Sequence, residues 1–234
     1  TGCEVFGPLV EPQPWIVELP ALRELAPSEL PRGTARGFEF KAPVIETPIY
    51  MAWLEQRVRA LGATLRTRRV LFFEEAFLTA PLVVNATGLG ARELAEDEDL
   101  HAAAGQVLRV EHTGSDRFWF DFSGPQPTYV IPRANDVVLG GSLEDEHADE
   151  AARRAMLEGI RARCRKLDPQ LANARELGTQ RGLRPARSVV RLEAEKPGPE
   201  RMLIHDYGHG GAGVTLSWGC AEEVARLARS WRDG

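Results

Sequence analysis

The chain has 234 residues, 43% of them hydrophobic and 27% charged, enough to build one large domain or two small ones without disulfide or metal support. Its 34 acidic residues outnumber its 29 basic ones, and the net charge of -5 argues against a nucleic-acid partner. No apolar run approaches the roughly 20 residues that a membrane span requires. The three cysteines are far apart in the sequence, which favours a reducing compartment such as the cytoplasm.

The first part of the chain predicts an irregular segment followed by an α/β pattern. Residues 1–46 are Pro-rich and show no clear hydrophobic period. Helix-start signals at Thr47 and apolar residues at spacings of three and four predict a helix that ends near Gly62. Residues 63–72 predict one or two strands, and residues 81–86 a fully buried strand. Helix, strand and buried strand in this order are typical of a three-layer α/β fold.

After Gly105 the pattern changes to short strands separated by turn residues, as in an antiparallel sheet. These strands are expected at 106–110, 118–122, 128–132 and 137–139. A long polar helix with one apolar stripe is expected over 146–167. Two further strands, at 188–192 and 202–205, lead into a Gly-rich turn and a last amphipathic helix over 213–232.

The Gly-rich turn over residues 207–213 is the densest chemical signal. Gly208, Gly210 and Gly213 satisfy the pattern G-x-G-x-x-G between a strand and a helix, which is the form of a dinucleotide fingerprint. The fingerprint normally continues into a second strand with an acidic residue, and no such strand fits before Gly234. Two alternatives stay open: a helix start that contacts another anionic or electron-rich group, and a tight turn without a ligand.

A metal site is weighed at His205 and His209, four residues apart, with Cys220 further along. The two histidines are separated by a turn and do not share a helix face, and no carboxylate triad accompanies them. We therefore expect no metal.

A second chemical feature is the basic loop that contains Arg181, Arg184 and Arg187 together with Gly and Pro. One of these guanidinium groups could bind a carboxylate with two hydrogen bonds. The alternative is a solvated loop.

Six sequence blocks, taken in order, resemble the D-amino-acid oxidase family, which includes D-aspartate oxidase. The last block and the Gly, Thr and Trp residues after it are the most specific. The blocks are Val83–Gly88, Gly105-Gln106, Tyr129–Arg133, Val138–Gly141, Gly182–Pro185 and His205–Gly211.

The resemblance implies a fold of class α/β plus α+β with two domains. A Rossmann-type FAD-binding domain is expected over 47–104 and 182–234. A substrate-binding domain with a mixed, mostly antiparallel sheet is expected over 1–46 and 105–181. Since the family begins with a strand, a G-x-G-x-x-G turn and a helix, we expect the FAD-binding domain to be incomplete, without its N-terminal βαβ unit and with apolar surface exposed.

The resemblance also implies the reaction and its site. The family oxidises D-amino acids to 2-oxo acids, ammonia and hydrogen peroxide, by hydride transfer from the substrate Cα to N5 of FAD, and dioxygen is the final acceptor. Arg184 is expected to pair with the substrate carboxylate, Tyr129 to bond or flank it, and the Gly211 carbonyl to accept from the amine. Val70 is expected to contact the adenine side of FAD. The flavin ring is expected to lie against Gly210, Gly211, Ala212, Gly213, Val214 and Thr215.

Because of one departure from the family pattern, the sequence does not indicate which substrate side chains the protein prefers. Eukaryotic members carry a second tyrosine shortly before the position of Tyr129, and residues 123–128 contain none. Two alternative functions also stay open: a related amine oxidase of the glycine or sarcosine oxidase type, and a non-catalytic fragment that needs a missing segment. A homodimer is an open expectation.

Overall fold

The computed structural model describes residues 1–143 and 147–232. The chain forms two compact units, each made of two segments. Unit 1 consists of Thr1–Thr64 and Gly105–Gly182, and unit 2 of Leu65–Ala104 and Leu183–Gly234. The first unit boundary follows Thr64, whereas the domain boundary was expected at residue 46. The assignment of functions to the two domains stays a prediction.

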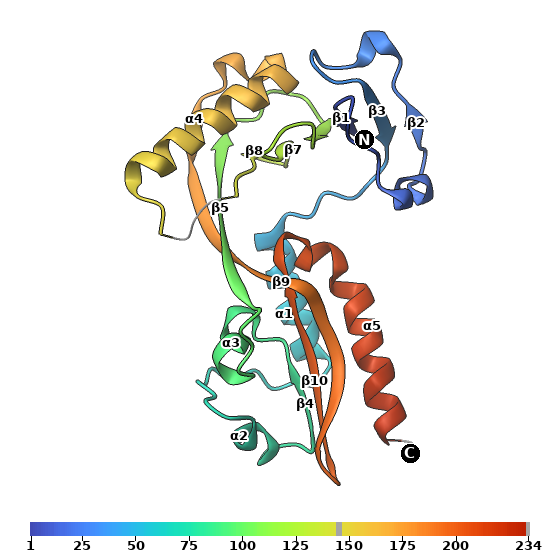
Figure 1. Cartoon of the computed structure of the whole chain (residues 1–234), viewed down its shortest axis with the longest axis vertical. Helices are drawn as coiled ribbons and strands as arrows, with labels where there is room; N and C mark the ends of the chain where they lie inside the picture. The colour runs from blue at the N-terminus through green and yellow to red at the C-terminus, as the bar shows by residue number, and fades with distance from the viewer. Residues whose placement is uncertain (144–146, 233–234) are drawn as a thin grey trace. The chain divides into compact units, whose positions relative to one another are not determined.

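Unit 1 is built on a mixed sheet with the strand order β2-β3-β1-β6-β7-β8-β5 (Figure 1). Only β1 and β6 pair in parallel, and the other neighbours are antiparallel. The strands are β1 (Gly2–Phe6), β2 (Arg23–Glu24), β3 (Arg36–Phe40), β5 (His101–Val110), β6 (Phe118–Asp121), β7 (Thr128–Pro132) and β8 (Val137–Gly140). The four short strands expected after Gly105 are therefore confirmed, and β5 begins earlier than expected.

The helix α4 (Glu150–Leu167) covers one face of this sheet and packs on β7 and β8. It begins where the Asp149 carboxylate accepts from the Ala152 backbone N–H at 2.8 Å. Residue 146, where the sequence predicted the helix to begin, lies outside the described residues. The apolar residues Ile160 and Cys164 of α4 pack in the main apolar core of unit 1, which also contains Val130 of β7. Since side chains alternate along a strand, Tyr129 points to the opposite face of β7.

Of the remaining helices of unit 1, the 3₁₀ helix after α4 adds Leu171 to this core. The helix α1 (Thr47–Ala60) is confirmed where the sequence predicted it, although none of its residues is buried. Two short 3₁₀ helices, η1 (Pro14–Glu18) and η2 (Pro27–Glu29), occupy the Pro-rich beginning of the chain, and a third, η4 (Pro169–Asn173), follows α4.

Unit 2 has the strand order β9-β10-β4, with β9 and β10 antiparallel and β10 and β4 parallel. The strands are β4 (Leu82–Asn85), β9 (Glu176–Gly198) and β10 (Arg201–His209). The helices are α2 (Phe73–Phe77), η3 (Gly88–Gly90), α3 (Ala91–Leu94), η5 (Gly210–Ala212) and α5 (Gly213–Arg232), and α5 packs on β10. Every helix in the described part of the chain is too short or too polar to span a membrane.

Two sequence predictions in unit 2 are wrong. Residues 63–72 form no strand, because within the described chain no neighbouring strand provides the hydrogen bonds that an extended segment needs. The strand at 81–86 is not fully buried: β4 is the last strand in the order, and Val84 is 41% exposed. An apolar run predicts a strand, but the position of that strand in the sheet decides how much of it is covered.

A polar network links β9 and β10 to Asp97, in the segment between α3 and β5. The Tyr207 hydroxyl donates to Asp97 at 2.7 Å, Arg187 donates to the same carboxylate at 2.9 Å, and Arg191 donates to the Tyr207 hydroxyl at 2.8 Å. Burial by itself would raise the pKa of Asp97. The hydrogen bond from Tyr207 and the charge of Arg187 outweigh burial and hold that pKa below its ordinary value.

Candidate functional site

The Gly-rich turn connects β10 to α5 in unit 2. Gly208 and Gly210 have φ angles of +87° and +56°, a region that favours glycine. A Cβ on Gly208 would also lie 2.8 Å from the Cβ of Arg187 on the adjacent strand. The glycines therefore serve the backbone path of the turn, and the first N–H groups of α5 point out of its N-terminus, where negative charge is stabilised.

The six residues expected to line the flavin form one continuous surface over η5 and the first turn of α5. Gly211, Ala212, Val214 and Thr215 are exposed. Apolar side chains continue the surface along the helix, where Leu216 is 42% and Trp218 66% exposed. An accessible glycine backbone, a helix N-terminus and neighbouring apolar side chains fit the face and edge of a flat, electron-accepting ring such as isoalloxazine.

The structure brings Arg184 and Gly211 together. A Cβ on Gly211 would lie 3.7 Å from Cδ of Arg184, so the arginine side chain lies against the turn. The half-buried guanidinium of Arg184 also donates to the Ala104 carbonyl at 3.3 Å. Arg184 and Gly211, two of the three residues expected to bind the substrate, are thus neighbours in space although they lie 27 residues apart in the sequence.

Tyr129, the third expected substrate residue, belongs to unit 1. Its ring lies over the backbone of β8, where a Cβ on Gly140 would come 2.1 Å from Cζ of the tyrosine. The ring of Phe120 on β6 lies 6.1 Å from that of Tyr129. The glycine of β8 therefore leaves the room that the tyrosine ring needs on this face of the sheet.

An apolar cavity of about 190 Å³ lies beside β6 and β7 in unit 1. It is lined by Phe40, Ala42, Pro43, Val44, Ile45, Phe118, Phe120 and Ile131. Ile131 lies two residues from Tyr129 on the same strand, so both side chains point to the same face. The sequence offered no signal for this cavity, because residues 42–45 come from the irregular segment after β3.

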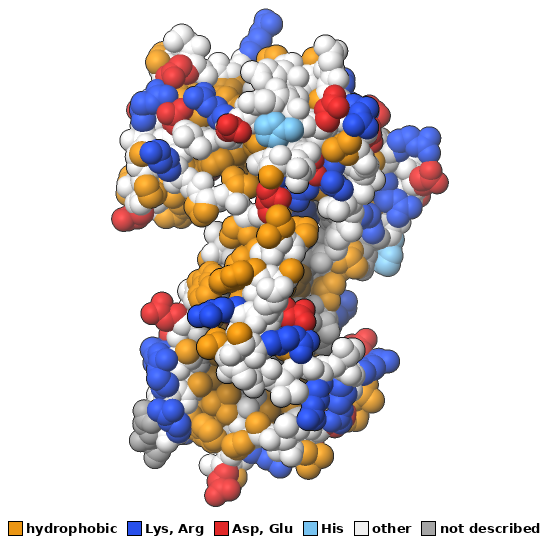
Figure 2. All heavy atoms as spheres, turned by 180° about the vertical axis from the view of Figure 1, so that it is seen from behind, with side chains coloured by type: hydrophobic (Ala, Val, Ile, Leu, Met, Phe, Trp, Pro, Cys, Tyr) orange, Lys and Arg blue, Asp and Glu red, His pale blue; other side chains and the backbone are white. Residues whose placement is uncertain are grey.

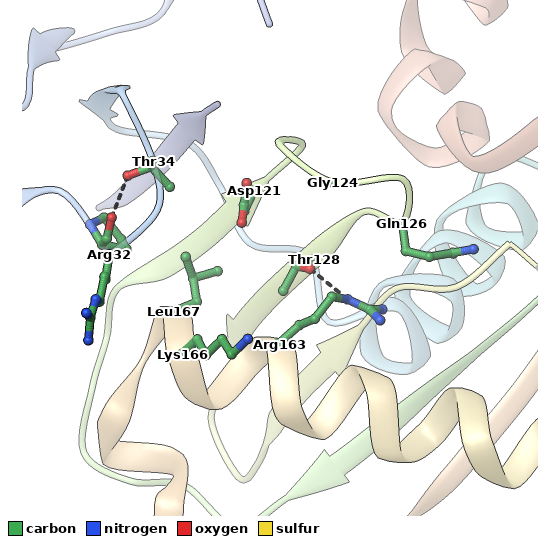
Figure 3. Close-up of a pocket in the computed structure, with 10 residues that line it drawn as sticks. Arg32, Thr34, Asp121, Gly124, Gln126, Thr128, Arg163, Lys166 and Leu167 are labelled. Carbon is green, nitrogen blue, oxygen red and sulfur yellow. Dashed lines mark hydrogen bonds between the residues drawn. The ribbon is translucent and has the colours of Figure 1, made fainter. Parts of the chain in front are cut away.

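A second cavity in unit 1, of about 100 Å³, is basic (Figure 3). Arg163 and Lys166 of α4 line it with Arg32, and Arg163 donates to the Thr128 hydroxyl at 3.0 Å and to the Gly141 carbonyl at 2.7 Å. In the described parts of the chain no carboxylate forms an ion pair with these three cations. None of the residues predicted for the active site lines this cavity.

Val70 lies where no strand forms. It belongs to residues 63–72, which the sequence predicted to be extended, and is half-buried in the irregular segment just before α2. The next residue, Leu71, donates its N–H to the Glu75 carboxylate at 3.0 Å, which fixes this segment to α2. The contact of Val70 with adenine stays a prediction.

The two histidines of the last sequence block, His205 and His209, have different surroundings in the structure. His205 is buried, with Nδ1 3.2 Å from the Asn85 amide of the neighbouring strand, and burial holds its pKa below the ordinary value. His209 instead lies with Asp206 and Cys220, a group that the sequence did not predict because its acid comes from the middle of a strand. Burial and the nearby Asp206 carboxylate raise the pKa of the Cys220 thiol.

The architecture fits an FAD-dependent oxidoreductase. Unit 1 has a mixed sheet, and unit 2 has a glycine turn before a long helix, with an arginine against the turn. The model of the family described as FAD dependent oxidoreductase matches residues 8–227. The chain belongs to this family, which implies FAD as cofactor, and both sequence predictions are confirmed.

Curated relatives are named D-amino-acid oxidase or D-aspartate oxidase. The chain is 44% identical to a D-amino-acid oxidase of Rubrobacter xylanophilus over 97% of its own length and 70% of the relative's. It is 41% identical to a D-amino-acid oxidase of Streptomyces coelicolor over 90% of its length and 65% of that protein's. It is 33% identical to a D-aspartate oxidase of Homo sapiens, over 97% of the chain and 68% of the relative. The chain thus spans about two thirds of these relatives.

Solved structures share the fold at low sequence identity. A glycine oxidase of Geobacillus kaustophilus superposes with a TM-score of 0.75 at 15% identity, covering 98% of this chain and 70% of that one. An iminodiacetate oxidase of Chelativorans superposes with a TM-score of 0.62 at 18% identity, covering 85% and 61%. These likenesses show the FAD-dependent oxidoreductase fold.

Proposed function

We propose that this protein catalyses the FAD-dependent oxidative deamination of D-amino acids. The observation that carries the proposal is the packing of Arg184 against Gly211 at the start of α5. It places a cation next to the backbone surface that suits a flavin. The names of the relatives at 33% to 44% identity support the same reaction.

The chain's own residues would bind and orient the substrate. The Arg184 guanidinium would pair with the substrate carboxylate through two hydrogen bonds, and the Gly211 carbonyl would accept from the amine. With the amine neutral, no protein base is needed at Cα, and holding the Cα–H bond toward the flavin is the main task. The chemistry that bound FAD would supply is acceptance of the hydride from Cα, with dioxygen as the final acceptor that would yield hydrogen peroxide. The imino acid that remains is hydrolysed by water to the 2-oxo acid and ammonia.

The cofactor would be held mainly by unit 2. The backbone of Gly210 and the five residues after it would line the flavin ring, with the N-terminus of α5 stabilising negative charge on its reduced form. Val70 would contact the adenine side. We assign the FAD-binding role to the domain proposed over 47–104 and 182–234. Val84 of β4 and Val214 at the start of α5 are exposed apolar residues. Their exposure supports our proposal that a further βαβ unit covers this Rossmann-type domain.

We propose a substrate-binding role for the domain expected over 1–46 and 105–181, which overlaps most of unit 1. Tyr129 would bond or flank the carboxylate. The neighbouring apolar cavity is lined by no charged side chain, which favours apolar over acidic D-amino acids. Ile131→Arg would test this choice: activity on D-leucine should fall more than tenfold, relative to activity on D-aspartate. A variant with an unchanged ratio would remove the cavity from substrate recognition.

Hydrogen peroxide release from a panel of D- and L-amino acids tests the reaction, and it is measured on the natural gene product. We expect activity on the D- but not the L-series, and no release from any D-amino acid would refute the proposal. Faster turnover of glycine than of D-alanine would favour a glycine oxidase instead.

Arg184→Ala tests the main site residue. Leaving the desolvated carboxylate without its charge partner should cost about 3 kcal/mol, so KM should rise about 100-fold. The matched control is Arg181→Ala, three residues earlier and exposed, for which KM should not change. An unchanged KM in Arg184→Ala would remove this arginine from the proposed role.

We also propose a cytoplasmic location, supported by three cysteines that are all free thiols. A homodimer stays a prediction. A sedimentation experiment measures the oligomeric state.

A further inference from the structure

Three side chains of different chemistry meet where β10 ends and α5 begins. They are Asp206 and His209 of β10 and Cys220 of the second turn of α5. Their ligand atoms all lie within 4.8 Å of one another. His209 Nε2 lies 3.3 Å from Cys220 Sγ and 3.2 Å from Asp206 Oδ1.

These separations suit a shared metal ion. In a tetrahedral zinc site with bonds of about 2.0–2.3 Å, neighbouring ligand atoms lie about 3.3–3.7 Å apart. Both measured distances from the imidazole nitrogen are within about 0.1 Å of that range. The third separation, between Asp206 Oδ1 and Cys220 Sγ, is no more than 4.8 Å, and these two side chains would turn toward the ion on binding.

The cluster also has an unused acceptor. Asp206 Oδ1 is buried and accepts no well-formed hydrogen bond within the described part of the chain, although the imidazole is near. Leaving a buried carboxylate oxygen without a partner is costly. A cation at the centre of the cluster removes that cost, because it bonds this oxygen directly.

The three side chains can be reached from solvent and are held in place by β10 and α5. The side chains of His209 and Asp206 are 13% and 19% exposed, so an ion can enter from solvent. Cys220 is 9% exposed and is held by a 20-residue helix, which fixes the thiol. The chain path between His209 and α5 is the Gly-rich turn, so a bound ion would tie the two ends of that turn together.

We propose that this chain binds one Zn²⁺ ion through Asp206 Oδ1, His209 Nε2 and Cys220 Sγ, with the fourth position taken by water. The mixture of thiolate, imidazole and carboxylate matches Zn²⁺ better than Mg²⁺ or Ca²⁺, which prefer oxygen ligands alone. Binding displaces the thiol proton, so zinc uptake releases a proton to solvent. This site differs from the histidine pair weighed from the sequence, because Asp206 takes the place of His205.

Cobalt substitution tests the site on the flavin-free chain. Co²⁺ should bind with a stoichiometry of one and give a sulfur-to-cobalt charge-transfer band in the near ultraviolet, and Zn²⁺ should abolish the band by displacement. Cys220→Ser should remove the band. His209→Ala and Asp206→Asn should each weaken Co²⁺ binding at least about tenfold.

Matched controls separate this site from other thiols and histidines. Cys164→Ser, in the core of unit 1, and His101→Ala, exposed in unit 2, should leave both the band and the affinity unchanged. Circular dichroism confirms that each variant is folded, and Asp206→Asn, which keeps the side chain's shape, is informative even if Cys220→Ser unfolds. A chain without the band, a band that persists in Cys220→Ser, or unchanged affinity in Asp206→Asn would overturn the proposal. Because no flavin is present, the outcome is independent of the oxidase reaction.

Discussion

The interiors of the two units differ in kind. Unit 1 buries a continuous apolar cluster beneath α4, including Leu108, Val130 and Ile160. The buried apolar cluster of unit 2 is small, made of Ala91, Leu100 and Tyr207, and Tyr207 also belongs to the polar network. Apolar packing is non-directional and tolerates acid, whereas the network depends on the geometry and charge of its members. We therefore expect unit 1 to be sensitive to lost volume and unit 2 to lost partners and to pH.

Both units also expose large apolar side chains at their surfaces. On the face seen in Figure 2, apolar side chains lie at the surface among charged ones. In unit 2 the exposed apolar residues include Val84 of β4, Val189 of β9 and Trp218 of α5. The Gly-rich turn, which we propose to contact the flavin, lies directly before α5, the helix that carries the exposed Trp218.

The largest expected effect comes from the core of unit 1. Ile160→Ala removes a side chain that is 0% exposed and leaves a cavity under α4, which should lower the free energy of unfolding by about 2–5 kcal/mol. Ile49→Ala on α1, where the isoleucine is 64% exposed, is the control and should change stability by less than about 0.5 kcal/mol. Urea denaturation measures both. Similar values for the two variants would contradict the assignment of the apolar core to unit 1.

A somewhat smaller effect is expected from the network of unit 2. Asp97→Ala leaves Tyr207 and Arg187 without their shared acceptor and should cost about 2–3 kcal/mol. Glu98→Ala, next in sequence and exposed, should be neutral. Hydrogen exchange resolved by segment should show the loss of protection in β10 and not in β7. Equal loss in both strands would mean that the network does not belong to unit 2 alone.

The pH dependence should follow the same network. The pKa of Asp97 is held below its ordinary value in the folded chain, so its contribution is fully present above about pH 3.8 and is lost as pH falls through the folded pKa. Between pH 5 and pH 3, Asp97→Asn should therefore lose less stability than the unmodified chain. Acid titration followed by circular dichroism measures the difference. Parallel titration curves would show that other carboxylates, such as Asp136 with its two arginines, dominate.

The smallest effect is expected at the start of α4. Asp149→Ala removes the cap of the Ala152 N–H and should cost about 1 kcal/mol. Glu150→Ala, one residue further and exposed, should cost only a few tenths, because it removes a surface ion pair with Arg154. Equal losses would show that the first turn of α4 is stabilised by charge and not by the cap.

Local patterns predicted much of unit 1. The alternation over 128–132 became β7, the stripe of apolar residues became α4, and Thr47 marks the start of α1. These elements are set by contacts within a few residues, which a sequence displays directly. The strand expected over 63–72 failed because a strand depends on a partner far away in the chain, and its own pattern cannot supply one.

The candidate site shows the same limit. The order of sequence blocks indicated the family, FAD, and the residues Arg184 and Gly211 before any contact was known. The packing of Arg184 on the turn, the apolar cavity beside Tyr129, and the separation of His205 from His209 came only from the structure.

The sequence by itself determined the family, the cofactor and the main helices and strands, because short motifs and local periodicity carry that information. Tertiary structure alone decided which residues meet. Asn85 reaches His205 through the register of two parallel strands, and Asp206 joins Cys220 because α5 packs back on β10. Such meetings depend on strand register and helix packing between residues distant in sequence, and no pattern of neighbouring residues encodes them.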